Sequence, residues 1–245
     1  MLLAIDIGNT AIKFGVFDGD DLVSKYVVPT HRDYSDDDLR RALTAYLEHA
    51  PDNVIFSSVV PELYSVVKEL FLREGIAAHQ VSASDDFGLI FNFSIDHIGT
   101  DRLVNAFAAV EKHGAPCIVV AFGTATTIDV INANREYLGG LIAPGPKAAA
   151  KALELVASKL PEVEIVEPAN VINKTTTAAI QAGIFYSQIG LVETAIPHIR
   201  AEVGESANVV VTGGYAHLIG DKCRSIDILE PDLTLHGLKM LYSRA

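Results

Sequence analysis

The sequence predicts an α/β protein made of two similar halves, and three observations support this prediction. Residues 1–20 contain two apolar runs joined by a Gly-containing turn, the pattern of a β-hairpin. Residues 117–131 repeat that pattern, again with a Gly and small polar residues between two apolar runs. Helix-like segments accompany both hairpins, and such internal similarity indicates a duplicated α/β unit.

The first half is expected to begin with the hairpin and a third strand at 22–28. A helix is predicted over 35–49, because Ser35 can cap it, acidic residues fill its first turn, and Leu39, Leu43 and Leu47 share one face. The other expected elements of this half are a strand at 53–59, a helix at 62–74, a strand at 77–81, a loop at 84–100 and a helix at 103–113.

The second half is expected to begin near Cys117, after the stop signal of residues 114–116. We therefore predict two domains, residues 1–115 and 116–245. After the second hairpin, the expected elements are a strand at 137–143, a helix at 147–160, a helix at 175–203 interrupted around Pro197, a strand at 208–212 and a helix at 232–243.

Composition excludes several classes of protein. Apolar residues make up 49% of the 245 residues and charged residues 20%, which is typical of a globular chain. The net charge of −12 argues against nucleic-acid binding. There is no signal peptide or membrane-length apolar run, so we expect a cytoplasmic protein with no membrane partner. The two cysteines form neither a disulfide framework nor a metal cluster, and Cys117 is expected in the core.

The two hairpins can be overlaid by placing residues 4–16 on residues 119–131. Gly8 then matches Gly123, Asn9 matches Thr124, and Asp6 matches Ala121. The first half thus has a carboxylate that the second half lacks. Two such turns, each presenting amides and hydroxyls to a shared cleft, would suit a polyphosphate.

The first turn, Asp6 to Thr10, contains the residue types of a nucleotide phosphate site. Gly8 allows a close backbone approach, Asn9 and Thr10 can donate to phosphate oxygens, and Asp6 can hold Mg²⁺. An ordinary hairpin turn would use the same residues. The second turn adds the hydroxyls of Thr124, Thr126 and Thr127 beside Gly123, although Thr is also a common strand residue.

Residues Gly99, Thr100, Asp101 and Arg102 stand at the start of a predicted helix. Asp101 could be a helix cap, or it could be a general base that accepts a hydroxyl proton in phosphoryl transfer, with Arg102 near the developing charge. No GxxxxGK[ST], GxGxxG, GxSxG or zinc-ligand spacing occurs. The motifs together favour a nucleotide-dependent enzyme.

In this order, the motifs resemble those of the type III pantothenate kinases, members of the acetate kinase, sugar kinase, chaperone and actin superfamily. The resemblance covers nearly the whole chain. The matching segments are Asp6–Thr10, residues 57–61 (SSVVP), Gly99–Arg102, residues 123–129 (GTATTID), residues 139–145 (GGLIAPG), Leu160-Pro161, Thr212–Gly214 and residues 233–238 (LTLHGL).

The resemblance implies duplicated ribonuclease-H-like (actin-like) domains with a cleft between them, in a homodimer. It implies transfer of the ATP γ-phosphate to pantothenate, the first step of coenzyme A synthesis, with Mg²⁺ and a monovalent cation (K⁺ or NH₄⁺). Asp101 would be the catalytic base and Asp6 the metal ligand. The implied nucleotide-binding residues are Asp6, Gly8, Asn9, Thr10, Lys13, Gly123, Thr124 and Thr126. The implied substrate-binding residues are Gly99, Thr100, Asp101, Arg102 and Thr176, the last from across the dimer interface.

The chain departs from the family pattern at four places. Thr175-Thr176 stands for the usual Asn-Thr, and Tyr215 follows Thr-Gly-Gly where the family often has Asp. The second phosphate motif of the family usually opens with Asp, where this chain has Ala121, and residues 91–98 lack the usual Tyr and Asn-Pro pair. These departures leave two alternatives to the kinase interpretation. One is a non-catalytic, regulatory homologue that binds nucleotide or a pantothenate-like ligand, and the other is a kinase for a different small alcohol.

Overall fold

The computed structural model describes residues 1–47, 51–157, 159–204 and 206–244. Contacts divide the chain into two compact units. Unit 1 comprises Met1–Gly88, Phe93–Ala108 and Leu233–Ala245, and unit 2 comprises Leu89–Asn92 and Ala109–Asp232. The chain therefore returns to unit 1 with its last helix, α6 (Leu233–Tyr242), which packs on strands of the first sheet.

Unit 1 is built on a five-stranded sheet of order β3-β2-β1-β4-β5. The hairpin strands β1 and β2 pair antiparallel, as do β2 and β3, whereas β4 lies parallel to both β1 and β5. Every residue of β1 is buried, as expected for a central strand covered on both faces. The strands are β1 (Leu2–Ile7), β2 (Ala11–Asp18), β3 (Asp21–Pro29), β4 (Asn53–Ser58) and β5 (Ala77–Gln80).

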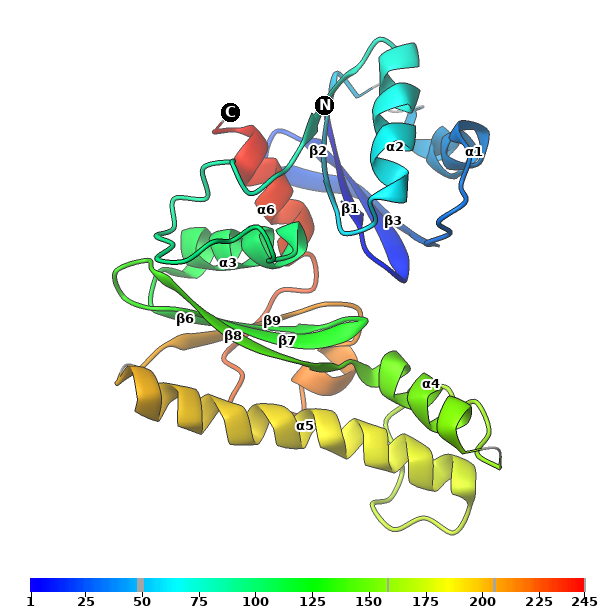
Figure 1. Ribbon diagram of the computed structural model, residues 1–245, viewed down its shortest axis with the longest axis vertical. Helices are drawn as coiled ribbons and strands as arrows, with labels where there is room; N and C mark the ends of the chain where they lie inside the picture. Colours follow the sequence, from blue (N-terminus) through cyan, green and yellow to red (C-terminus); the bar gives the residue numbers. More distant parts are fainter. Residues whose placement is uncertain (48–50, 158, 205, 245) are drawn as a thin grey trace. The chain divides into compact units, whose positions relative to one another are not determined.

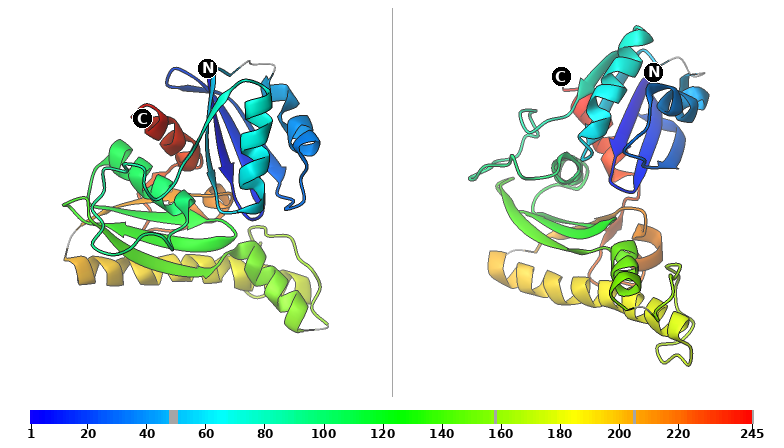
Figure 2. Two further views of the ribbon diagram at one scale, coloured as in Figure 1. Left: turned by 45° about the horizontal axis from the view of Figure 1, so that its top comes forward. Right: turned by 45° about the vertical axis from the view of Figure 1, so that its right-hand side comes forward.

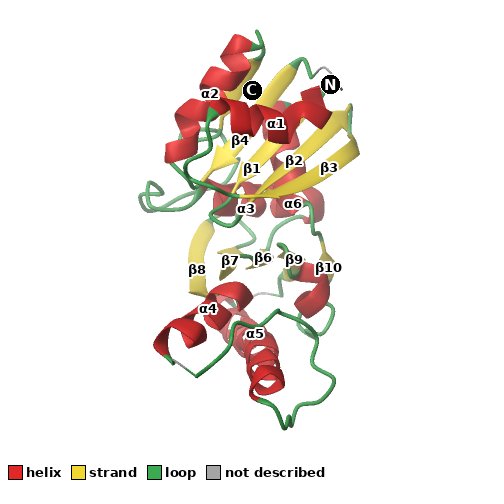
Figure 3. Cartoon of the chain, turned by 90° about the vertical axis from the view of Figure 1, so that its right-hand side faces the viewer, coloured by secondary structure: helices red, strands yellow, loops and turns green. Residues whose placement is uncertain are grey.

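Helices cover both faces of this sheet (Figure 3). Helices α1 (Asp36–Leu47) and α2 (Glu62–Arg73) bury Leu39, Leu63 and Val67 against Ile5 and Phe14 in one hydrophobic core. On the opposite face, α6 contacts β1, β2 and β4. Helix α3 (Thr100–His113) starts in unit 1, and its residues from Ala109 onward belong to unit 2.

Unit 2 repeats the sheet of unit 1. Its strand order, β10-β9-β6-β7-β8, matches that of unit 1 when read from the other edge, with an antiparallel hairpin beside two parallel strands. This is the ribonuclease-H-like arrangement, present twice. The strands are β6 (Cys117–Phe122), β7 (Ala125–Ile131), β8 (Tyr137–Pro144), β9 (Asn208–Thr212) and β10 (Ile228–Leu229).

The long helix α5 (Thr176–Val203) crosses one face of this second sheet (Figures 1 and 2). It buries Phe185, Val192 and Ile196 against Val120 and Ile128. Helix α4 (Pro146–Val156) packs against α5 and ends earlier than the predicted residue 160. Within the described residues, none of the helices has the length and apolar character that crossing a membrane would require.

The predicted interruption around Pro197 is wrong, because α5 continues through it. Proline inside a helix removes a backbone hydrogen bond and costs about 3 kcal/mol. Pro197 lies on the exposed face, whereas Ile196 and Ile199 are buried in the unit 2 core. The packing of these residues holds the helix together on both sides of the proline. Two short elements were not predicted, the π-helix η1 (Ala216–Gly220) and strand β10.

The overlay of the two hairpins is correct in the first strand and wrong by one residue in the second. Asp6 pairs with Lys13 across the first hairpin, and Ala121 pairs with Thr127 across the second. Lys13 is therefore the structural counterpart of Thr127, although the overlay placed Ile12 there. The second turn is one residue shorter, and a one-residue shift moves each side chain to the other face of a strand.

Candidate active site

Asp6 is a carboxylate within the buried central strand of unit 1. The residue is only 6% exposed, and its Oδ2 lies 3.3 Å from Nζ of Lys13 on the neighbouring strand. A buried carboxylate is costly unless it is paired, and Lys13 supplies the opposite charge. Ile5 and Ile7 point into the core under α1 and α2, so the alternation of the strand directs Asp6 to the opposite face.

The turn that follows Asp6 is closed by a hydrogen bond from the amide of Gly8 to the carbonyl of Ala11, 3.0 Å long. Asn9 and Thr10 are exposed at its tip. Their side chains are therefore accessible to a ligand, as the phosphate-site interpretation requires.

A second segment, residues 30–32, supports this turn and was not identified from the sequence. Thr30 donates twice to it, from its amide to the carbonyl of Thr10 at 3.0 Å and from its hydroxyl to the carbonyl of Gly8 at 2.7 Å. Arg32 Nη2 lies 3.5 Å from Asn9 Oδ1, and Arg32 also pairs with Glu62 at 3.2 Å. The turn is thus fixed from outside and has two cations, Lys13 and Arg32, in its surroundings.

The segment Gly99–Arg102 lies at the start of α3, in the same unit as Asp6. Thr100 is the first residue of the helix, and its hydroxyl lies 2.7 Å from the Ser57 hydroxyl at the end of β4. The carboxylate of Asp101 accepts a 2.9 Å hydrogen bond from the amide of Arg102. The structure therefore connects the predicted acceptor segment to strand β4, the direct neighbour of β1.

In unit 2, the second predicted phosphate turn packs tightly against the start of α4. The amide of Gly145 donates to the carbonyl of Thr124 at 3.1 Å, and a Cβ added to Gly145 would lie 2.2 Å from the carbonyl of Gly123. No residue other than glycine fits there without moving the turn. Gly123 is half-buried and Thr124 is exposed, so the turn remains accessible.

Thr126 lies inside unit 2. It is 1% exposed, and its hydroxyl donates to Oε1 of Gln188 on α5. Gln188 in turn donates to the carbonyl of Pro144 at 3.2 Å. This buried network joins β7, β8 and α5 beneath the turn. It could not be predicted from local sequence patterns, because its members lie far apart in the chain.

Ala121 lies between two threonines, Thr127 on β7 and Thr212 on β9. All three residues are in register, so their side chains share the sheet face opposite α5. Thr212 is 1% exposed, and its Oγ1 has no hydrogen-bond partner among the described residues. The position equivalent to Asp6 therefore has hydroxyl groups around it but no carboxylate.

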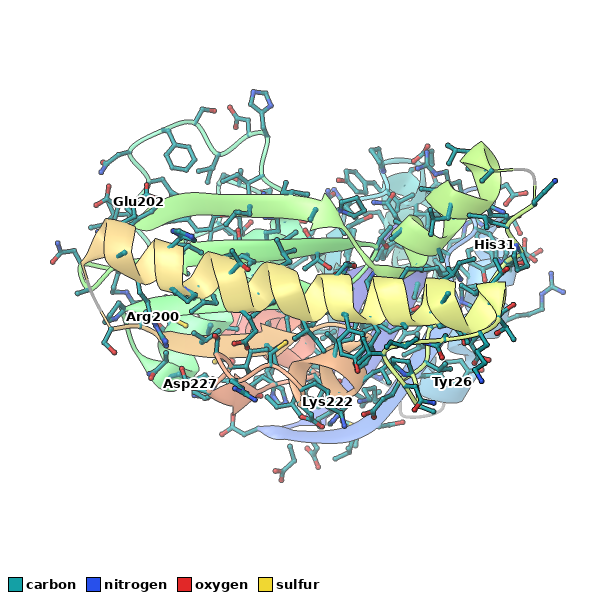
Figure 4. All side chains as sticks on the ribbon, turned by 90° about the horizontal axis from the view of Figure 1, so that it is seen from below. Tyr26, His31, Arg200, Glu202, Lys222 and Asp227 are labelled. Atoms are coloured by element: carbon teal, nitrogen blue, oxygen red, sulfur yellow. The ribbon has the colours of Figure 1, made fainter. Side chains whose placement is uncertain are left out.

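Thr176, the predicted acceptor contact, is the first residue of α5 and is exposed. The preceding Thr175 caps the helix, since its hydroxyl accepts a 3.3 Å hydrogen bond from the amide of Ala178. Thr176 belongs to unit 2, whereas the other predicted substrate residues, Gly99 to Arg102, belong to unit 1. At the far end of α5, Arg200 pairs with Asp227 at 3.4 Å (Figure 4), a contact outside the predicted site.

Two ribonuclease-H-like sheets, each with a Gly-containing hairpin turn, define the fold class as a duplicated ribonuclease-H-like (actin-like) fold. A solved structure shares this fold, that of a conserved putative Baf family transcriptional activator from Campylobacter jejuni. Its TM-score is 0.62 at 19% identity, and the match covers 99% of this chain and 98% of that one. At this identity the likeness concerns the fold alone.

The family itself follows from sequence comparison. The model of the type III pantothenate kinase family matches residues 2–198. A type III pantothenate kinase of Moorella thermoacetica is 43% identical over 255 residues, which cover 100% of this chain and 99% of the relative. One of Dehalococcoides mccartyi (strain CBDB1) is 40% identical over 249 residues, 98% and 95% of the two chains. The chain belongs to the type III pantothenate kinase family.

Proposed function

We propose that the protein transfers the γ-phosphoryl group of ATP to the terminal hydroxyl of pantothenate, the first step of coenzyme A synthesis. Family membership over the full length of the chain supports this activity. The observation that supports it most directly in the structure is the link between Asp101 and the Asp6 strand, through Ser57 and Thr100, within one compact unit.

In this proposal, Asp101 accepts the proton of the attacking hydroxyl, and Gly99, Thr100 and Arg102 contact the acceptor with it. Phosphoryl transfer needs little covalent chemistry from a protein, so positioning and charge neutralisation supply most of the rate. Lys13 is the cation beside Asp6 that can neutralise phosphate charge. The other proposed nucleotide contacts are Gly8, Asn9, Thr10, Gly123 and Thr124, while Thr126 supports the second turn from within.

The residues of unit 1 fit a magnesium ion that is bound together with ATP. Mg²⁺ is usually held by one or two carboxylates plus substrate phosphates and waters, and Asp6 supplies one carboxylate. Among the described residues, no group of three or more His, Cys, Asp or Glu side chains could hold a metal ion. The remaining ligands would therefore come from the ATP phosphates and waters. When bound, the ion would neutralise phosphate charge; the Asp6 carboxylate would hold it, and the ammonium of Lys13 would orient that carboxylate.

The family resemblance also implies a monovalent cation, K⁺ or NH₄⁺. The donors near Ala121 are the hydroxyls of Thr127 and Thr212, without the carboxylate that the family usually has there. We propose that this protein binds such a cation more weakly than its relatives with the carboxylate do. A variant that restores the carboxylate tests this, as described in the Discussion.

A homodimer is the proposed assembly, and the surface of unit 2 supports it. Strand β8 is the edge of its sheet and exposes Leu138, Leu141 and Ile142, the last at 66%. A groove of about 720 Å³ lies between β8 and α5, lined in part by Leu138 and Leu191. Exposed apolar patches and unpaired edge strands are typical of protein interfaces. Light scattering should give twice the chain mass, and Ile142→Glu should halve it.

An ATP-coupled assay with pantothenate tests the proposed function. Turnover should require ATP, Mg²⁺ and pantothenate, and Asp101→Asn should lower kcat by about 10²- to 10⁴-fold, the usual contribution of a general base. The variant should keep its circular dichroism spectrum. Absence of turnover under every monovalent cation tried would overturn the proposal.

The second candidate function is a nucleotide-binding regulatory homologue without catalysis, and Ala121 is the observation that favours it. It predicts that calorimetry detects ATP binding while no phosphopantothenate forms. Turnover of another small alcohol, but not of pantothenate, would instead indicate a kinase with a different acceptor, in line with the altered residues 91–98. For each of these functions we propose a cytoplasmic location.

A further inference from the structure

Ser57 is a fully buried residue beside Asp6. It is 0% exposed and stands in register with Asp6 across the parallel strands β1 and β4, which neighbour each other in the sheet. Val54 and Phe56 point into the core under α1 and α2, so Ser57 points to the opposite face, as Asp6 does. The two side chains are therefore direct cross-strand neighbours on one face of the sheet.

The hydroxyl of Ser57 has a partner in helix α3. It lies 2.7 Å from the hydroxyl of Thr100, which in turn lies 3.4 Å from the carbonyl of Ser58. Either hydroxyl can donate in the bond between the two side chains. In both directions the bond joins β4 to the first residue of α3.

Thr100 is the residue at which α3 begins, and Asp101 is the next residue. The first turn of α3 is closely packed around the Asp101 carboxylate: a Cβ added to Gly99 would lie 2.5 Å from Asp101 Oδ1 and 3.4 Å from the Val59 side chain. The amides of Arg102 and Leu103 both donate to the carbonyl of Gly99, at 3.0 and 3.3 Å. A shift of Thr100 would therefore displace the Asp101 carboxylate with it.

We propose that the Ser57 hydroxyl is a positioning group for phosphoryl transfer, because its bond to Thr100 fixes the Asp101 carboxylate relative to the strand that holds Asp6. The inference rests on the proposed role of Asp101 as general base. Ser57 touches neither substrate nor metal in this proposal and acts only through Thr100. A misplacement of about 1 Å in a reacting group can cost about 100-fold in rate, so a single buried hydrogen bond at this place can control turnover.

The adjacent residue Ser58 offers a matched control. It is 4% exposed and equally part of β4, but its side chain bonds only locally, to the amide and carbonyl of Val60 at 3.1 and 3.0 Å. Ser57→Ala and Ser58→Ala thus remove the same hydroxyl from neighbouring buried positions. Only the first substitution breaks the connection to α3.

The experiment compares kcat, the KM for pantothenate and the Kd for ATP in these variants. Ser57→Ala should lower kcat about 10- to 100-fold with the ATP affinity unchanged within about twofold. Ser58→Ala should keep kcat within about twofold, even if both variants melt at a lower temperature. Thr100→Val, which keeps the shape of threonine without its hydroxyl, should lose kcat as Ser57→Ala does, and Thr100→Ser should recover most of that loss.

The two single substitutions remove the same hydrogen bond, so their effects should not add. The kcat of the double variant Ser57→Ala/Thr100→Val should therefore lie within about threefold of that of the slower single variant. Equal kcat in Ser57→Ala and Ser58→Ala would overturn the proposal, and so would multiplicative losses in the double variant. If Ser57→Ala does not fold, the comparison of kcat in Thr100→Val and Thr100→Ser decides, with the KM for pantothenate expected to stay unchanged, since a lost acceptor contact would raise it. If Asp101→Asn is inactive and Ser57→Ala is fully active, only the positioning role of Ser57 is refuted. If Asp101→Asn is active, both the role of Asp101 as general base and the positioning role of Ser57 are refuted.

Discussion

The two hairpins occupy equivalent places in the two sheets, yet their polar residues differ. In unit 1, Asp6 faces Lys13 on one neighbouring strand and Ser57 on the other, and both side chains have partners. In unit 2, Ala121 faces Thr127 and Thr212 at the same positions. The two sheets thus share their strand order, but only unit 1 has a charged pair at this register position, so the two hairpins should respond differently to equivalent substitutions.

The largest effect is expected at Asp6. Asp6→Asn would leave both hairpins without a carboxylate at this register position and should lower kcat by about 10²- to 10³-fold, the usual cost of removing one group that stabilises transition-state charge. The KM for MgATP should rise as well. Asp18→Asn serves as the control, because Asp18 is exposed at the other end of β2. Retention of more than a tenth of the activity in Asp6→Asn would show that the site does not depend on this carboxylate.

A smaller effect, in the opposite direction, is expected at Ala121. Ala121→Asp would make unit 2 resemble unit 1, and we expect half-maximal activation by K⁺ at about tenfold lower concentration, a difference of about 1.4 kcal/mol. Ala121→Asn introduces a side chain of the same shape without charge and should not change the K⁺ response. The same K⁺ dependence in both variants would refute a cation-binding role for this position.

The hairpins and most helices could be predicted from sequence because they depend on local patterns. Apolar runs with a glycine between them predict β1 and β2, and a capped, periodic segment predicts α1. The failures involve distant packing. Helix α5 continues through Pro197 because buried residues on both sides of the proline hold it, and the sequence pattern alone does not show which residues those are.

The candidate site shows the same limit. Asp6 and Asp101 could be selected by residue type and motif, but the hydroxyl pair of Ser57 and Thr100 joins residues 43 positions apart, and that of Thr126 and Gln188 joins residues 62 apart. Ser and Thr are common in strands and at helix starts, so nothing in their local sequence distinguishes them. The one-residue slip between Lys13 and Thr127 was hidden in the same way, since it appears only in the strand register.

Thr212 permits a further test of the comparison, with a smaller effect. It is the counterpart of Ser57, but its buried hydroxyl has no partner among the described residues. An unsatisfied buried hydroxyl costs about 1 kcal/mol or more. Thr212→Val should therefore raise the melting temperature by about 2–4 °C in calorimetry. Thr212→Ser keeps the hydroxyl and should give no increase. A lower melting temperature for Thr212→Val would mean that the hydroxyl has a partner in solution.

The cysteines provide a test confined to unit 2, with no effect expected on turnover. Burial raises the pKa of the Cys117 thiol from an ordinary value of 9.0 to about 12. The pKa of Cys223 is also raised to about 12, mainly by burial and to a smaller extent by the negative charge of Glu193. Both thiols should stay neutral and resist alkylation at pH 8.5 in the native protein, while urea-unfolded protein takes up two labels. Rapid labelling of the native protein would show that unit 2 opens without global unfolding.

The same thiols predict a pH dependence of stability. In the unfolded chain they ionise at a lower pH than in the folded protein, so their contribution to the free energy of unfolding is complete below pH 9 and declines as the pH rises towards 12. The variant Cys117→Ala/Cys223→Ala should lack that decline.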